Sequence, residues 1–206
     1  MDLSNFGKFP SLRDKTVFVT GGGSGIGASI VECFVDQGAR VAFVDIDEAA
    51  NDMRHVWKDV TPDYWDERMA INLRPVFFAI QSVAPQMKRI GSGSIINFGS
   101  ISWKRALGGM PAYTTAKAAI HGLTRGMARD LGQDSIRVNT VLPGWVMTER
   151  QKRLWLDEAG EKVIDQEQCL KGRVLPVDLA RIVLFLASDD ARMCSAQEFT
   201  VDGGWA

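Results

Sequence analysis

The sequence predicts an α/β fold: a doubly wound parallel sheet with helices on both faces, forming a single domain. Two observations predict it. Short β-branched runs that stop at glycine or aspartate alternate along the chain with longer segments of helical periodicity. The 206 residues contain no internal repeat, low-complexity tract or linker, and they are enough to build one substantial core.

The first predicted elements form a strand–helix–strand unit. Residues 16–20 (TVFVT) predict a buried strand that stops at three glycines, and residues 40–44 (RVAFV) predict a second strand closed by Asp45. Between them, apolar residues recur at helical spacing from Ile26 onward, and Gly38 stands where that helix would end.

The same alternation continues further along the chain. Thr61 followed by Pro62 is typical of a helix N-terminus, and Pro75 and Pro85 are expected to kink or interrupt the helix that follows. The remaining predicted strands are residues 94–98, 136–141 and 199–201, and the remaining predicted helices are residues 112–131 and 176–187.

Composition limits the function classes. The formal net charge of −1 gives no reason to expect a nucleic-acid partner, and no apolar stretch is long enough to predict a membrane span. The first residues lack the pattern of a signal peptide. The three cysteines lie far apart and lack the spacing of a metal site, so we expect no metal, a reducing compartment and a cytoplasmic location.

A glycine-rich turn, TGGGSGIG at residues 20–27, is the first motif with chemical meaning. Glycine is needed where a backbone turns sharply or approaches a phosphate, and the N–H groups at a helix start suit a pyrophosphate. A glycine cluster alone is often only a turn, but this one has a strand before it and a helix after it. We therefore expect a Rossmann-type dinucleotide site made by Gly21, Ser24, Gly25, Ile26 and Gly27.

Asp45 indicates which dinucleotide binds. At the end of the second strand, its carboxylate can accept hydrogen bonds from the adenosine ribose and would repel a 2′-phosphate, which favours NAD over NADP. The alternative is a solvated loop acid beside Asp47 and Glu48.

Tyr113 and Lys117 form the second motif, Tyr-x-x-x-Lys. Residues four apart share one face of a helix, so the ammonium group can lie near the phenol. A tyrosine in water has a pKa of about 10, and a nearby cation favours the phenolate. The pair can therefore serve as an acid/base for an alcohol or a carbonyl, whereas in isolation it would be an ordinary surface pair.

These motifs, with others in the same order, resemble the short-chain dehydrogenase/reductase family. The resemblance adds Asn72 in a predicted helix, Ser100 after the strand at residues 94–98, and the stretch PGWVMT at residues 143–148. It implies a catalytic set of Asn72, Ser100, Tyr113 and Lys117, in which Ser100 orients the substrate oxygen and Asn72 completes a proton relay. It also implies that the cofactor is contacted by Tyr113, Lys117, Pro143, Gly144, Val146 and Thr148, and that the enzyme is a homotetramer.

Shorter strings resemble the sugar-oxidising branch of the family, the 1-dehydrogenases of D-xylose, D-galactose and L-rhamnose. Hydroxyl, amide and aromatic side chains near the expected site suit hydrogen bonding to a sugar and stacking on its face. The expected substrate-binding residues are Asn51, Ser100, Ser102, Trp103, Tyr113 and Trp145. Core or subunit-contact roles for Trp103 and Trp145 remain an equal alternative.

One segment departs from the family pattern. After Glu48 the chain passes straight to Asn51, where the resemblance implies roughly 45 further residues, including a strand at the centre of the sheet. Either the sequence lacks a segment that the molecule has, or the deletion is genuine and weakens the case for folding and activity. We expect a break or a long step between Asp47 and Asn51, and a gap between the strands at residues 16–20 and 94–98.

The resulting hypothesis is an NAD-dependent oxidoreductase that transfers hydride from C1 of an aldose and produces a lactone. The expected partner is a small polar substrate, with no nucleic acid and no membrane. Two alternatives remain: a 3-oxoacyl or other carbonyl reductase of the same family, and a catalytically silent nucleotide-binding protein if the deletion is genuine.

Overall fold

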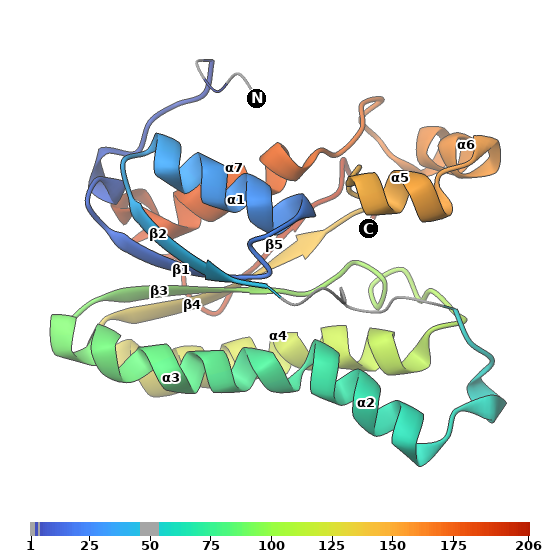
Figure 1. Cartoon of the computed structure of the whole chain (residues 1–206), viewed down its shortest axis with the longest axis horizontal. Helices are drawn as coiled ribbons and strands as arrows, with labels where there is room; N and C mark the ends of the chain where they lie inside the picture. Colours follow the sequence, from blue (N-terminus) through green and yellow to red (C-terminus); the bar gives the residue numbers. More distant parts are fainter. Residues whose placement is uncertain (1–2, 4, 46–53) are drawn as a thin grey trace. The chain divides into compact units, whose positions relative to one another are not determined.

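A computed structural model describes residue 3, residues 5–45 and residues 54–206, and it confirms an α/β fold with parallel strands. The strands are β1 (Thr16–Thr20), β2 (Arg40–Val44), β3 (Gly93–Phe98), β4 (Ile136–Pro143) and β5 (Glu198–Val201) (Figure 1). The helices are α1 (Gly25–Asp36), α2 (Pro62–Asn72), α3 (Arg74–Ile90), α4 (Pro111–Leu131), α5 (Glu149–Trp155), α6 (Glu158–Glu167) and α7 (Pro176–Ala187). Short 3-10 helices occupy Pro10–Leu12, Trp57–Asp59, Gly132–Asp134 and Asp189–Ala191.

The described strands form two hydrogen-bonded sheets. β1 pairs with β2 in parallel, and the second sheet has the order β3–β4–β5, in which β3 and β4 are also parallel. The chain divides into two compact units. The first holds Met1–Asp47, Pro143–Arg192 and Val201–Trp205, and the second holds Glu48–Leu142, Met193–Thr200 and Ala206.

In the first unit, α1 packs against α7 and against β1 and β2. The helical spacing predicted from Ile26 onward buries Ile30, Cys33 and Phe34 of α1. Opposite them, α7 buries Leu179 and Leu184. Burial also raises the pKa of the Cys33 thiol, which keeps it protonated and makes it a packing group.

The other face of the β1–β2 sheet carries exposed apolar side chains. Alternation along each strand and the pairing of Phe18 with Ala42 place Phe18, Ala42 and Val44 on one face. All three are exposed, and Phe18 keeps 49% of its surface. Parallel sheets normally bury both faces, so the expected cover on both sides is absent here among the described residues.

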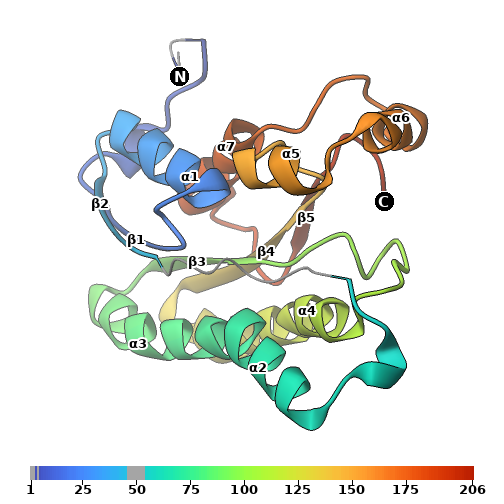
Figure 2. The ribbon, with the colours of Figure 1, turned by 45° about the vertical axis from the view of Figure 1, so that its right-hand side comes forward.

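In the second unit, α3 and α4 lie side by side on one face of β3 and β4 (Figures 1 and 2). α4 runs from Pro111 to Leu131, one residue longer than predicted, and its buried residues recur every four positions. The core they enter includes Ile80, Ile95, Ile136 and Val138.

The helix predicted to begin near Pro62 is interrupted where proline indicated. Thr61 caps α2 by accepting a hydrogen bond from the backbone N–H of Tyr64 at 3.2 Å. α2 ends at Asn72, Leu73 leaves the helical conformation, and α3 starts just before Pro75. Pro85 lies inside α3 without ending it. Within the described part of the chain, no helix is long and apolar enough to cross a membrane.

The expected break between Asp47 and Asn51 lies outside the described residues. β1 and β3 belong to different sheets, so they are not the hydrogen-bonded neighbours that a cleanly closed deletion would require. Among the described strands, β1 pairs only with β2 and β3 pairs only with β4, which leaves one edge of each strand without a partner.

The exposure of Phe18 on the β1–β2 sheet can be tested by substitution. Replacing exposed Phe18 by Thr is expected to change the free energy of unfolding by no more than about 0.5 kcal/mol, because little apolar surface is lost from the core. Binding of the dye ANS should also fall. Val19→Thr in the same strand is the matched control: it places a hydroxyl in the core and is expected to cost about 1–3 kcal/mol. Urea denaturation and ANS fluorescence measure both, and a larger cost at Phe18 than at Val19 would contradict the prediction.

Candidate active site

The glycine turn between β1 and α1 has the geometry of a phosphate cradle. A side chain at Gly27 would place its Cβ 1.7 Å from the carbonyl oxygen of Gly21, so that position accepts only glycine. Gly21 and Gly25 have φ values of 73° and 52°, in the left-handed region that favours glycine. Ser24 makes no side-chain cap at the start of α1. The turn therefore brings backbone close to a helix N-terminus, which fits a dinucleotide pyrophosphate.

Asp45 lies directly after β2 and braces this turn. Its Oδ2 accepts a hydrogen bond from the backbone N–H of Gly23 at 2.6 Å. The N–H groups of Gly21 and Gly22 donate to the carbonyl of Val44 at 2.7 and 3.3 Å, so three hydrogen bonds join the end of β2 to the turn. The Asp45 residue stays exposed, as a group that meets a ribose must be.

The PGWVMT stretch meets the same turn within the first unit. The side chain of Thr148 would lie 3.2 Å from a Cβ at Gly25. Thr148 also caps α5 through the N–H of Gln151, which fixes its side chain. Gly144 is hydrogen-bonded to Val201, and a Cβ there would strike Asp202 at 2.6 Å. The structure thus brings the glycine turn and Thr148 together.

Tyr113 and Lys117 lie on the first turns of α4, as their spacing predicted. The Lys117 ammonium is 5.7 Å from the centre of the Tyr113 ring. Its Nζ also donates a hydrogen bond of 3.5 Å to the carbonyl of Phe98, the last residue of β3. Both side chains are half-buried, which leaves them accessible to a small substrate. A cation held beside a phenol in this way favours the phenolate and suits acid/base chemistry.

Ser100 follows β3 by two residues. Its hydroxyl accepts a hydrogen bond from the N–H of Ser102 at 3.1 Å, which orients the side chain. Gly99 precedes it and approaches Lys117 so closely that a Cβ would lie 3.6 Å from the Lys117 carbonyl oxygen. Ser100 therefore lies beside the helix that carries Tyr113 and Lys117.

Asn72 ends α2, which packs against α4. Its amide Nδ2 donates to the carbonyl of Arg68 at 3.1 Å, and its Oδ1 is buried without a hydrogen-bond partner among the described residues. An acceptor left open in this way is where a water of a proton relay would bind.

The substrate residues expected by resemblance differ in their surroundings. Ser102 is buried, and Trp103 is half-buried beside His121, with ring centres 6.1 Å apart. Trp145 donates a hydrogen bond to Gln151 at 3.0 Å and stacks on Trp205. The Trp145 ring thus has a packing role that the sequence left open as an alternative. Asn51 lies outside the described residues.

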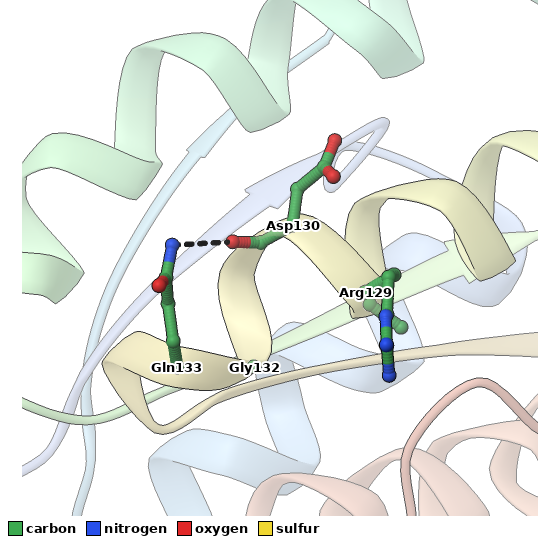
Figure 3. Close-up of a pocket in the computed structure, with 5 residues that line it drawn as sticks. Arg129, Asp130, Gly132 and Gln133 are labelled. Carbon is green, nitrogen blue, oxygen red and sulfur yellow. Dashed lines mark hydrogen bonds between the residues drawn. The ribbon is translucent and has the colours of Figure 1, made fainter.

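A surface hollow lies apart from the motif residues. A surface hollow of about 670 Å³ is lined by Ala128, Arg129, Asp130, Gly132 and Gln133 (Figure 3). It lies at the end of α4 opposite to Tyr113, so it does not belong to the candidate site. Among the described residues no cluster of His, Cys, Asp or Glu could hold a metal ion.

Two features were missed by sequence reasoning. Arg68 is buried, with Nη2 2.8 Å from Glu67 and with Nε and Nη1 lacking hydrogen-bond partners among the described residues. Its charge gave no sign of burial. The second is a contact between His121 and Glu198. His121 could have been noticed, because it lies one helical turn after Lys117, but Glu198 is distant in the sequence.

The chain is similar to proteins of known families. A family model described as Enoyl-(Acyl carrier protein) reductase matches residues 49–206. D-xylose 1-dehydrogenase of Caulobacter vibrioides is 44% identical over 243 residues, covering 96% of this chain and 98% of its own length. The protein named "Probable galactose dehydrogenase GalD" of Rhizobium meliloti is 42% identical over 248 residues, covering 96% of this chain and 97% of its own length.

Solved structures share the fold. A protein from Agrobacterium tumefaciens superimposes with a TM-score of 0.89 at 22% identity, covering 97% of this chain and 98% of its own. A protein from Thermus thermophilus gives a TM-score of 0.84 at 28% identity, covering 93% of this chain and 98% of its own.

The alignment also measures the absent segment. The 243 positions aligned with the Caulobacter protein exceed the 206 residues of this chain by 37. At least that many positions of the relative therefore have no counterpart here, which agrees with the segment expected to be absent.

Proposed function

The chain belongs to the short-chain dehydrogenase/reductase family, and on that premise we propose that it oxidises the C1 hydroxyl of a cyclic aldose to a lactone, with NAD as hydride acceptor. The observation that carries the proposal is the Tyr113–Lys117 pair beside Ser100, in a chain 44% and 42% identical to proteins named as sugar dehydrogenases. An assay of NADH formation across a panel of aldoses tests it.

The residues divide the chemistry between them. Tyr113, as phenolate, accepts the proton of the C1 hydroxyl while the C1 hydrogen leaves as hydride and the C–O bond becomes a carbonyl. Lys117 stabilises the phenolate, and Ser100 donates a hydrogen bond that holds the substrate oxygen. Asn72 supports a water that passes the proton on toward solvent. The cofactor supplies the hydride acceptor, held by the glycine turn, Asp45 and the stretch Pro143 to Thr148.

NAD is the proposed cofactor because of Asp45. Its exposed carboxylate lies against the glycine turn, where it can accept hydrogen bonds from ribose hydroxyls and repel a 2′-phosphate. The same charge argues against the carbonyl-reductase alternative where that reaction uses NADPH. Comparing aldoses with ketoacyl thioesters as substrates separates the two.

Two observations favour the catalytically silent alternative. At least 37 positions of the Caulobacter relative are absent, and the β1–β2 sheet exposes Phe18 and Val44. If that deletion is genuine in the molecule, the glycine turn can still bind NAD while substrate turnover is lost. If calorimetry detects NAD binding but no aldose is oxidised, the catalytically silent alternative is favoured.

Assembly and location complete the proposal. α3 exposes Phe77 and Phe78, and α4 presents Gly122 and Gly126 with open space around them. Exposed aromatics on α3 and uncovered glycines on α4 would allow helices of two copies to pack closely, which suits the homotetramer of the family. We place the protein in the cytoplasm because its described cysteines are free thiols, as in a reducing compartment.

Removing the phenol tests the acid/base role. Tyr113→Phe is expected to lower kcat by ~10²–10⁴-fold, because the proton acceptor is lost while the ring remains. NAD affinity, measured by calorimetry, should be retained. Tyr64→Phe alters the other tyrosine of the chain and is the matched control. Near-native turnover in Tyr113→Phe would overturn the assignment.

Cofactor choice tests Asp45. Asp45→Ala removes both the ribose acceptor and the charge, so NAD affinity should fall and the NADP/NAD ratio of kcat/KM should rise. Asp45→Asn keeps a side-chain acceptor for the Gly23 N–H and removes only the charge. The ratio should rise in both variants. If the native protein already prefers NADP, the hypothesis that Asp45 selects NAD is wrong.

Assembly can be measured directly. Light scattering at micromolar concentration is expected to give the mass of a tetramer, and Phe78→Asp should shift it toward smaller species, because a charge would be buried in the interface. Ile90→Asp, at an exposed position at the end of α3, serves as control. A monomeric native protein excludes the tetramer.

A further inference from the structure

A charged cluster in the second unit joins three segments that are far apart in the sequence. Glu198, the first residue of β5, places Oε1 2.5 Å from Nδ1 of His121 and Oε2 3.0 Å from Nζ of Lys104. Lys104 also lies over the ring of Trp103, with Nζ 5.6 Å from its centre. One carboxylate therefore contacts both helix α4 and the segment after β3.

The cluster lies beside the catalytic candidates. His121 follows Lys117 by one helical turn and Tyr113 by two, so the three share one side of α4. Phe98 pairs with Val141 across the sheet, and Gln197 bonds to Thr140 next to it, which puts Glu198 level with the end of β3. The segment that Lys104 anchors, residues 101–106, begins immediately after Ser100 and contains Ser102 and Trp103.

Burial separates this cluster from an ordinary surface pair. The side chain of Glu198 is 16% exposed, and those of Lys104 and His121 are 30% and 32% exposed. Exposed pairs contribute little, but the ion pair of Lys104 with Glu198 is partly removed from water, and such a contact is stronger than one on the open surface. The Glu198 carboxylate is the group that Lys104 and His121 share, so removing its charge weakens the link between the segment and α4.

We propose that Glu198 is a positioning residue for aldose binding: its carboxylate fixes the segment 101–106 against α4 and so sets Ser100 and Trp103 relative to Tyr113. This inference rests on the proposed function. The described ionic contacts of Glu198 are with Lys104 and His121. It acts through Lys104 and His121, and none of these three residues belongs to the catalytic set.

The variant Glu198→Gln keeps the size of the side chain and removes its charge. The KM for the aldose is expected to rise about tenfold, with kcat changed less than threefold and NAD affinity unchanged. Lys104 and Arg105 are trypsin sites within the segment. Trypsin cleavage after them under native conditions, followed by mass spectrometry, should accelerate in Glu198→Gln. Asp134→Asn breaks the comparable Lys88–Asp134 pair, at 2.7 Å in the same unit, and should change neither quantity.

A second variant, Lys104→Gln, removes the other charge of the pair and should raise KM in the same way if Glu198→Gln fails to fold. Unchanged KM and unchanged cleavage in a folded Glu198→Gln protein overturn the proposal. If the native protein oxidises no aldose, the proposed function fails, and the trypsin measurement decides the positioning role alone: faster cleavage supports it, and equal cleavage overturns it.

Discussion

The close approach of Gly27 to the carbonyl of Gly21 is the contact on which the glycine turn of the first unit depends. No side chain fits between them, so the first turn of α1 can lie directly on the end of β1. That closeness places the N-terminal turn of α1, whose N–H groups suit an anion, against the glycine turn and near Thr148. Asp45 then fixes the turn through Gly23. A larger residue at position 27 would displace the glycine turn, the first turn of α1 and Asp45 together.

Local patterns were enough to predict most elements, whereas contacts distant in the sequence were not. β1, β2 and α7 have the predicted bounds, because β-branched runs and helical spacing are set within a few residues. The pairing of Tyr113 with Lys117 followed from one turn of helix. By contrast, α5 and α6 escaped prediction because each is short and mostly polar. The stacking of Trp145 on Trp205 and the burial of Arg68 depend on tertiary packing, which no local pattern encodes.

The two sheets differ in how well their faces are covered. The β3–β4 pair packs with α3 and α4 around a continuous core, whereas the β1–β2 pair packs with α1 on one face and exposes Phe18 and Val44 on the other. An apolar sheet face that is left exposed to water costs free energy, because no packing contact offsets it. Each unit sets the geometry of its own motif residues. The glycine turn does so in the first unit, and α4 does so in the second.

The way the first unit is assembled from distant parts of the chain has a consequence for folding order. α1 packs on α7, and these helices are separated by nearly the whole second unit. The second unit is built mainly from one continuous stretch, so its contacts close short loops, while the first must wait until its C-terminal helix has been synthesised. During translation the β1–α1–β2 unit therefore leaves the ribosome without its partner helix.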